Sequence, residues 1–212
     1  MQRIELFTME EGGAADRHER ADAAANRALI LHTAERLFAE RGVANVCMAE
    51  IAEAAGVGKG TLYRRFANKA ELCLSLMDRQ MADFQGESLT RFRRQTAAGV
   101  PYLDQLADFL AALVDFTEFH SPLLVEVAHG GLLQSEQHLK LPHAWQYLTV
   151  SALLRSAARR EELVPGLDLD YIGEGLLAPL EIDIFRYHRD VRGYPIERIS
   201  DGLRSFVELL KQ

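Results

Sequence analysis

The stretch AGVGKGTLYRRFANKAEL, residues 55–72, places three glycines and several basic residues among aliphatic ones. It suits either a loop around a nucleotide phosphate or a pair of short helices that lies on a larger ligand. A Walker-type phosphate loop needs a glycine five residues before its Gly-Lys pair, and Ser or Thr directly after that pair. Glu53 and Gly60 occupy these two positions, and a short amphipathic helix precedes the stretch where a buried strand is required. The phosphate-loop interpretation therefore fails.

The same residues fit a helix-turn-helix. The spacing predicts short helices at about 48–55 and 59–66, joined by Gly56-Val57-Gly58, and a glycine is usual in such a turn. Leu62 and Phe66 are four residues apart, so they share one helix face and are expected to point inward. The remaining positions of the second helix form an outward set: Gly60, Thr61, Tyr63, Arg64 and Arg65.

This outward set has the chemistry of a DNA-reading surface. A glycine allows close approach, Thr61 offers a hydroxyl and a methyl group, and arginine can bind guanine through two hydrogen bonds. A merely solvated helix face is the alternative. Against it, Gly60 would weaken an exposed helix without any compensating gain.

The rest of the chain also shows helical patterns. A first helix is expected at about 26–41, with Gly42 as its left-handed C-cap, and Asn68 is a suitable N-cap for a fourth. Beyond residue 80, Gly- and Pro-containing breaks separate further helical segments. We expect these from Pro101, from Ser121-Pro122 to about 130, and at about 141–162, 168–191 and 196–211. No alternation typical of strands occurs, so the predicted fold class is all-α.

Residues 26–77, above all IAEAAGVGKGTLYRRFANKAEL at 51–72, resemble the DNA-binding domain of the tetracycline-repressor (TetR) family of bacterial regulators. The resemblance implies a helix-turn-helix DNA-binding domain at 26–78 and a larger helical ligand-binding and dimerisation domain at 79–212. Residues 1–25 are polar and lack an apolar stripe, so they are expected to form a flexible arm. The implied function is that of a homodimeric repressor that binds a palindromic DNA operator and is released by a small-molecule effector.

The family also implies roles for individual residues. The position of Thr61 and its neighbours reads bases, while the positions of Lys59, Tyr63 and Lys69 hold phosphates. Three positions depart from the family pattern: Cys47 stands where Thr is common, Gly58 where Ser is frequent, and Arg65 where His is common. The candidate DNA-binding residues are Cys47, Gly58, Lys59, Gly60, Thr61, Tyr63, Arg64, Arg65 and Lys69.

The C-terminal region supplies candidates for the other two sites. The last two helices of the family pair with those of a second subunit, which makes the candidate dimer interface Ile172, Leu176, Leu180, Ile184, Leu203, Phe206 and Leu210. Plain closure of the monomer core is the alternative for these residues. The middle helices carry aromatic and histidine residues that suit an apolar effector pocket: Tyr102, Phe109, Phe116, His120, His129 and Trp145.

Composition limits the other functions. The net charge is −7, so any anion-binding function must be local; residues 26–79 hold eight Lys or Arg against six Asp or Glu, whereas residues 80–212 hold 13 against 19. The two cysteines match no zinc or redox motif, and no secretion signal or membrane span is predicted, so a cytoplasmic protein is expected. No metal site, cofactor or catalytic set is predicted, and an enzyme is not expected. A helical small-molecule-binding or adaptor protein without DNA-binding activity is the competing hypothesis.

Overall fold

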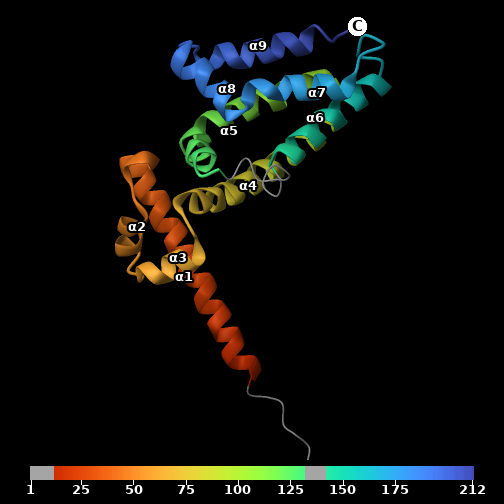
Figure 1. Ribbon diagram of the computed structural model, residues 1–212. Helices are drawn as coiled ribbons and strands as arrows, with labels where there is room; N and C mark the ends of the chain where they lie inside the picture. Colours follow the sequence, from red (N-terminus) through yellow and green to blue (C-terminus); the bar gives the residue numbers. More distant parts are fainter. Residues whose placement is uncertain (1–11, 132–141) are drawn as a thin grey trace, which may run out of the picture. The chain divides into compact units, whose positions relative to one another are not determined.

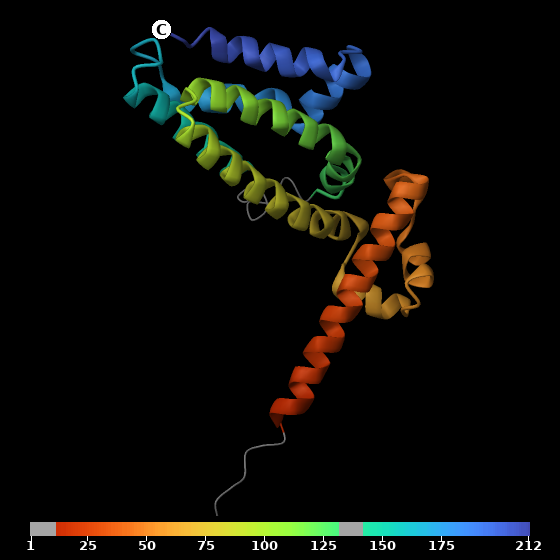
Figure 2. The same cartoon turned by 180° about the vertical axis from the view of Figure 1, so that it is seen from behind.

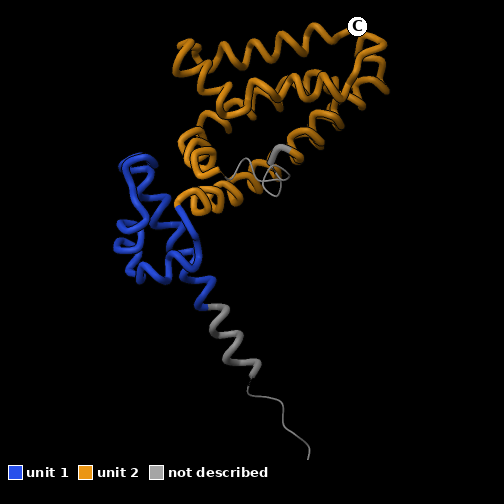
Figure 3. Tube along the Cα trace, in the orientation of Figure 1, with its two compact units in different colours: residues 1–68 blue, residues 69–212 orange. Residues whose placement is uncertain are grey.

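The computed structural model describes residues 12–131 and 142–212, which form helices joined by short connections, with one isolated antiparallel bridge between Leu163 and Lys211 (Figure 1). The chain divides into two compact units, residues 1–68 and residues 69–212 (Figure 3). The predicted all-α fold class is therefore confirmed for the described residues.

The described part of the N-terminal unit, residues 12–68, contains three α-helices and one short 3-10 turn. These are α1 (Gly12–Arg41), η1 (Val43–Asn45), α2 (Met48–Ala54) and α3 (Lys59–Arg65). Ile30, Ile51 and Leu62, one from each α-helix, are fully buried, which fixes the three helices around one small core. Gly42 ends α1 at a φ of 79°, and its N–H donates to the Phe38 carbonyl at 2.8 Å, as predicted for a left-handed cap.

The start of α1 differs from the prediction. The helix begins at Gly12, so the expected start at residue 26 is wrong, and the arm predicted over residues 1–25 is helical from residue 12 onward. Residues 1–11 lie outside the described part of the chain. Alanine is abundant between residues 14 and 25, and alanine favours a helix by its own propensity without needing an apolar stripe to bury.

The C-terminal unit is built around α5 (Tyr102–His129), which contacts α4 (Lys69–Ala97), α6 (Pro142–Arg159) and α9 (Ile196–Glu208). Figures 1 and 2 show α9 running beside α5 in both views. Between α6 and α9 lie four shorter elements: α7 (Leu169–Leu177), η3 (Ala178–Leu180), α8 (Ile182–Arg186) and the π-helical η4 (Tyr187–Val191). One large apolar core joins α5, α6, α7 and α9, and Leu106, Leu110, Leu154 and Val207 are completely buried in it.

Two predicted boundaries in this unit are wrong, and both involve proline. The break expected at Ser121-Pro122 is absent, because α5 continues through Pro122 and buries His120 on one side of it and Val127 on the other. Conversely, the single helix expected over 168–191 is interrupted at Pro179, which lies in η3. At Pro122 the packing of α5 compensates for the backbone hydrogen bond that proline cannot donate, so the helix continues. At Pro179 the α-helix ends and a 3-10 turn follows.

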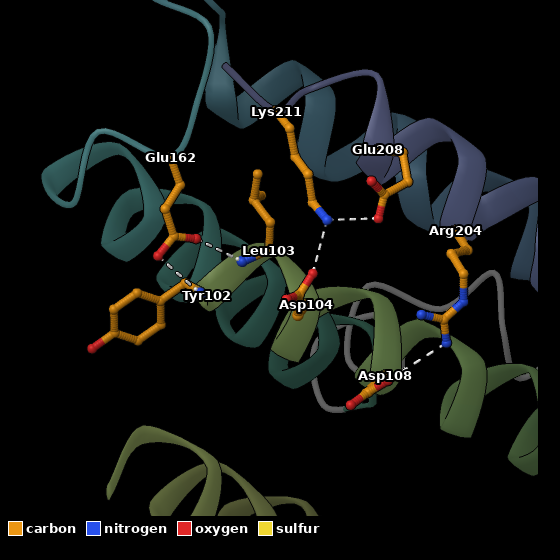
Figure 4. A network of polar contacts seen from close by, with 8 residues as sticks. All are labelled: Tyr102, Leu103, Asp104, Asp108, Glu162, Arg204, Glu208 and Lys211. Carbon is orange, nitrogen blue, oxygen red and sulfur yellow. Dashed lines mark hydrogen bonds and ion pairs between the residues drawn. The ribbon is translucent and has the colours of Figure 1, made fainter. Parts of the chain in front are cut away.

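A network of polar contacts fixes the first turn of α5 (Figure 4). The carboxylate of Glu162 accepts the backbone N–H groups of Tyr102 and Leu103, both at 3.0 Å, and these are donors that a helix start leaves unpaired. Lys211 Nζ lies 2.8 Å from Asp104, so α9's C-terminal flank is bound to the same turn. Further contacts join Lys211 to Glu208 and Arg204 to Asp108.

Candidate nucleic-acid interface

Helix α3 has one buried face and one exposed face. Leu62 is 0% exposed and Phe66, which directly follows the helix, is 2% exposed, so these two side chains anchor α3 in the core of the N-terminal unit. The Arg27 guanidinium lies 5.5 Å from the centre of the Phe66 ring. Opposite this anchor lies the predicted outward set, of which Gly60, Tyr63, Arg64 and Arg65 are exposed and Thr61 is half-buried. Lys59, the first residue of α3, is exposed as well. The helix thus presents three basic side chains and a phenol together, as a groove-reading helix requires.

Glycine at position 60 has no structural cause within the chain. A Cβ built there meets nothing within 4 Å, and the backbone is not in the left-handed region. Gly60 is the second residue of α3, in its first turn, where glycine costs less than the roughly 1 kcal/mol that it costs relative to alanine in a helix interior. Its retention on the exposed face of α3 therefore fits a surface that another molecule approaches closely.

The start of α2 is held by a carboxylate that the sequence reasoning did not single out. Glu50 accepts the N–H of Cys47 at 2.8 Å and the Arg41 guanidinium at 2.7 Å. The hydrogen bond from the Cys47 backbone, followed by that from Arg41, lowers the pKa of Glu50 to about 2. The spacing Cys47-x-x-Glu50 is that of a capping box, so the signal was present in the sequence. Cys47 itself is exposed at the N-cap of α2.

Lys69, the predicted phosphate-binding residue of the fourth helix, is the first residue of α4. Its Nζ lies 3.3 Å from Glu126 Oε2 on α5, and only 16% of its side chain is exposed. The amine therefore already has an anionic neighbour within its own unit. The buried thiol of Cys73 has its pKa raised to about 12, mainly by burial and next by the charge of Glu126, with Lys69 acting in the opposite sense.

Four of the six predicted effector-site residues meet in one aromatic cluster. Phe84 of α4, which the prediction missed, links them: its ring centre lies 4.7 Å from that of Phe116, 6.0 Å from Trp145 and 6.2 Å from Phe109. His120 stacks on Phe116 with ring centres 4.0 Å apart. The repeating apolar pattern of α4 did not reveal that Phe84 faces α5, because a pattern predicts burial without naming the partner.

His120 supplies the polar group of this cluster. Its Nδ1 lies 2.7 Å from the Phe116 carbonyl oxygen and its Nε2 lies 2.6 Å from the side-chain oxygen Oε1 of Gln80. Burial lowers the pKa of His120, opposed by the hydrogen bond to Phe116, so the neutral ring is favoured. The Phe116 carbonyl oxygen can only accept, so Nδ1 carries the single N–H of a neutral ring; Nε2 then accepts from Gln80 only when the amide is turned so that its –NH2 group faces the ring.

The other two predicted effector-site residues lie elsewhere. Tyr102 is the first residue of α5 and His129 is the last, and His129 is exposed. Surface hollows also lie away from the aromatic cluster: a groove of about 710 Å³ runs along α4. Its lining is mostly polar: Ala82, Asp83, Gly86, Glu87, Thr90, Arg91 and Arg94. None of these lining residues belongs to the aromatic cluster.

The predicted dimer residues divide into two groups. Leu176, Leu180 and Leu203 are at most 9% exposed and belong to the core of the single chain, so their assignment to a subunit interface is corrected. Ile172 and Leu210 are half-buried against the same core. Ile184 and Phe206 are 42% and 53% exposed, and three further apolar residues, in η4 and directly after α9, are exposed as well: Tyr187, Val191 and Leu209.

A buried anchor, a glycine-containing turn and an exposed basic helix define the N-terminal unit as a helix-turn-helix domain. Residues 30–76 match the family described as bacterial regulatory proteins, tetR family, so this segment is similar to the DNA-binding part of that family. An HTH-type transcriptional regulator of Staphylococcus aureus is 41% identical to this chain over 75 residues. This match covers 35% of the chain and spans 38% of the length of that relative, and a second S. aureus regulator matches to the same extent.

Solved structures share the fold over most of the chain. FadR of Thermus thermophilus, a TetR-family transcriptional repressor solved in complex with lauroyl-CoA, is similar with a TM-score of 0.64 and 20% identity, over 86% of this chain and 93% of that one. The fatty acid degradation regulator FadR of Bacillus halodurans has a TM-score of 0.60 and 20% identity, over 86% and 94% of the two chains.

Two negative findings apply to the described residues alone. Within residues 12–131 and 142–212, there is no group of three or more His, Cys, Asp or Glu side chains that could hold a metal ion. No helix in this part of the chain has the length and apolar character needed to cross a membrane.

Proposed function

We propose that the protein is a ligand-responsive transcriptional repressor that binds a palindromic DNA operator as a homodimer and is released by a small molecule. The observation that carries this proposal is the two-faced helix α3, with Leu62 and Phe66 buried and Lys59, Tyr63, Arg64 and Arg65 exposed on the other side. Arginine and lysine on such a face supply both phosphate contacts and base readout. We further propose that it acts in the cytoplasm, without a cofactor or enzymatic activity.

Dimerisation is part of the proposal because one recognition helix contacts only a few base pairs. Two half-sites about one helical turn of DNA apart give a useful specificity. The exposed apolar residues on α8 and α9, including Ile184 and Phe206, supply a surface for this contact. Exposure of such apolar side chains to water does not stabilise a single chain, and a contiguous exposed apolar patch is typical of an interaction surface.

For the effector, we propose a small, largely apolar or aromatic molecule that binds at the cluster of Phe84, Phe109, Phe116 and Trp145. Aromatic walls with one polar group are the usual composition of a small-molecule site. The neutral His120 ring and the Gln80 amide supply that polar group. Binding there would favour one arrangement of the surrounding helices, which is the requirement for coupling to DNA affinity.

Selection of bound duplexes from a random DNA pool tests this function. We expect enrichment of a palindrome, with an affinity that falls steeply as salt rises because phosphate contacts release counterions. Enrichment of no sequence, together with ligand binding by the intact chain, would instead establish a helical ligand-binding protein without DNA-binding activity.

A further inference from the structure

The last turns of α5 lie tightly on the first turn of α4. Gly130 caps α5, and a Cβ built there would be only 2.4 Å from the Cβ of Ala70, which leaves no room for a side chain. Ala70 is 3% exposed, and Val127, one turn earlier on α5, is 1% exposed. The two helix ends are therefore in direct contact, and displacement of one must be accommodated by the other.

An ion pair lies beside this contact. Glu126 of α5 is 3.3 Å from Lys69 of α4, with 29% and 16% of the two side chains exposed. Partial burial reduces screening by water and salt, so the attraction is stronger than that of a fully exposed pair. Burial is the main cause of the raised pKa of the neighbouring Cys73 thiol; the charge of Glu126 raises this pKa further and that of Lys69 lowers it, so both charges lie close to the thiol.

Lys69 is the residue for which the TetR resemblance implies a phosphate contact. A carboxylate and a phosphate are both oxyanions, and each is attracted by the same ammonium group and by the positive end of the 29-residue helix α4. A phosphate can therefore engage Lys69 fully only at the expense of its contact with Glu126.

We propose that Glu126 competes with DNA phosphate for Lys69 and so lowers the DNA affinity of the free protein. This inference rests on the proposed DNA-binding function. It makes Glu126 a positioning residue, which acts on DNA through Lys69. Glu126 also lies on α5 less than two helical turns after His120. A movement of this end of α5 that alters the aromatic cluster would therefore also move Glu126 relative to Lys69.

The test is a double-mutant cycle on DNA affinity with Glu126→Gln, Lys69→Met and both together, using the duplex selected with the wild type. We expect Glu126→Gln to bind about two- to fivefold more tightly at low salt, with the gain shrinking as salt screens the pair. In the Lys69→Met background the same change should have no effect, because the group for which Glu126 competes has gone. Glu126→Asp, which keeps the charge on a shorter side chain, should restore part of the wild-type affinity.

Asp115→Asn is the matched control, since it removes one negative charge from an exposed position on the same helix. Its affinity should stay at the wild-type value. The inference is overturned if Asp115→Asn tightens binding as much as Glu126→Gln, or if the gain persists in the Lys69→Met background. Retained helicity and thermal unfolding of each variant ensure that a change in affinity is not a loss of fold. If the wild type binds its selected duplex and the cycle shows no coupling, only the competition is disproved; if the wild type selects no DNA, the proposed function itself is disproved.

Discussion

At the scale of single residues, we expect replacement of Gly60 to have opposite effects on the stability of the protein and on its affinity for DNA. Gly60→Ala should raise the free energy of unfolding by about 0.5–1 kcal/mol, because the new methyl group meets nothing and the helix gains propensity. The same methyl group on the exposed face should weaken operator binding by about tenfold or more. Denaturant unfolding and a DNA titration measure the two effects.

Gly86→Ala is the control for Gly60→Ala, since Gly86 is an exposed residue of α4 and a Cβ built there also meets nothing within 4 Å. It should stabilise the protein similarly and leave DNA affinity unchanged. Equal DNA affinity of the Gly60→Ala variant and the wild type would show that α3 does not approach DNA closely.

Glu50 gives a pH dependence with a defined sign. Its pKa is lowered from 4.5 to about 2 in the folded protein by the Cys47 N–H and the Arg41 guanidinium. A lowered folded pKa contributes stability that is present above about pH 4.5 and is lost as the pH falls towards 2. We expect the melting temperature of the wild type to fall more over this interval than that of Glu50→Gln, measured by thermal unfolding at a series of pH values. Parallel curves would contradict the role of this carboxylate in holding α2.

At the scale of elements, α9 carries buried apolar residues such as Leu203 and an exposed one, Phe206, which we propose lies in the subunit interface. Phe206→Glu should give a monomer that keeps its helical content, because this side chain is 53% exposed on the single chain. Light scattering measures the mass and circular dichroism the helicity. A dimer of unchanged stability would place the subunit interface elsewhere.

Leu203→Ala is the contrasting change on the same helix. Leu203 is 2% exposed in the monomer core, so its truncation should cost about 2–5 kcal/mol of unfolding free energy. Its effect should appear as lower thermal stability of the chain itself, whether or not the subunits associate.

The same helix shows how far sequence reasoning reaches. Local rules predicted α2, the turn at Gly56 and α3 closely, because cap, glycine and the Leu62–Phe66 spacing act over a few residues. The periodicity of α9 predicted burial correctly for Leu203 but could not assign it to the core of one chain or to a contact between two. Likewise, Pro122 was read as a break because its neighbours on other helices are invisible in a local pattern. Phe84 and Glu126 were missed for the same reason, because each makes its important contact with a residue more than thirty positions away in the sequence: Phe116 for Phe84 and Lys69 for Glu126.

At the scale of the whole molecule, the proposed function requires that effector binding and DNA release be linked by one coupling free energy. Trp145 is the only tryptophan and packs edge-on against Phe84 and Phe109, so it reports directly on the aromatic cluster. An effector that enters this cluster should change tryptophan emission and weaken operator binding over the same concentration range, about 5- to 150-fold at saturation. Fluorescence titration and a DNA-binding assay on the same sample measure both.

Phe84→Leu gives this prediction its control, because it alters the cluster while Trp145 remains as the reporter. It should shift both titration curves to the same extent. Operator release without any change in emission would place the effector away from the aromatic cluster.

The contrast between the two cysteines has a practical outcome. Cys73 is fully buried with a thiol pKa of about 12, so it carries almost no thiolate at neutral pH, whereas Cys47 is exposed beside the helix-turn-helix. A maleimide dye is accordingly expected to react with the native protein at Cys47 and not at Cys73, which gives a single labelling position at the start of α2 without any engineered substitution.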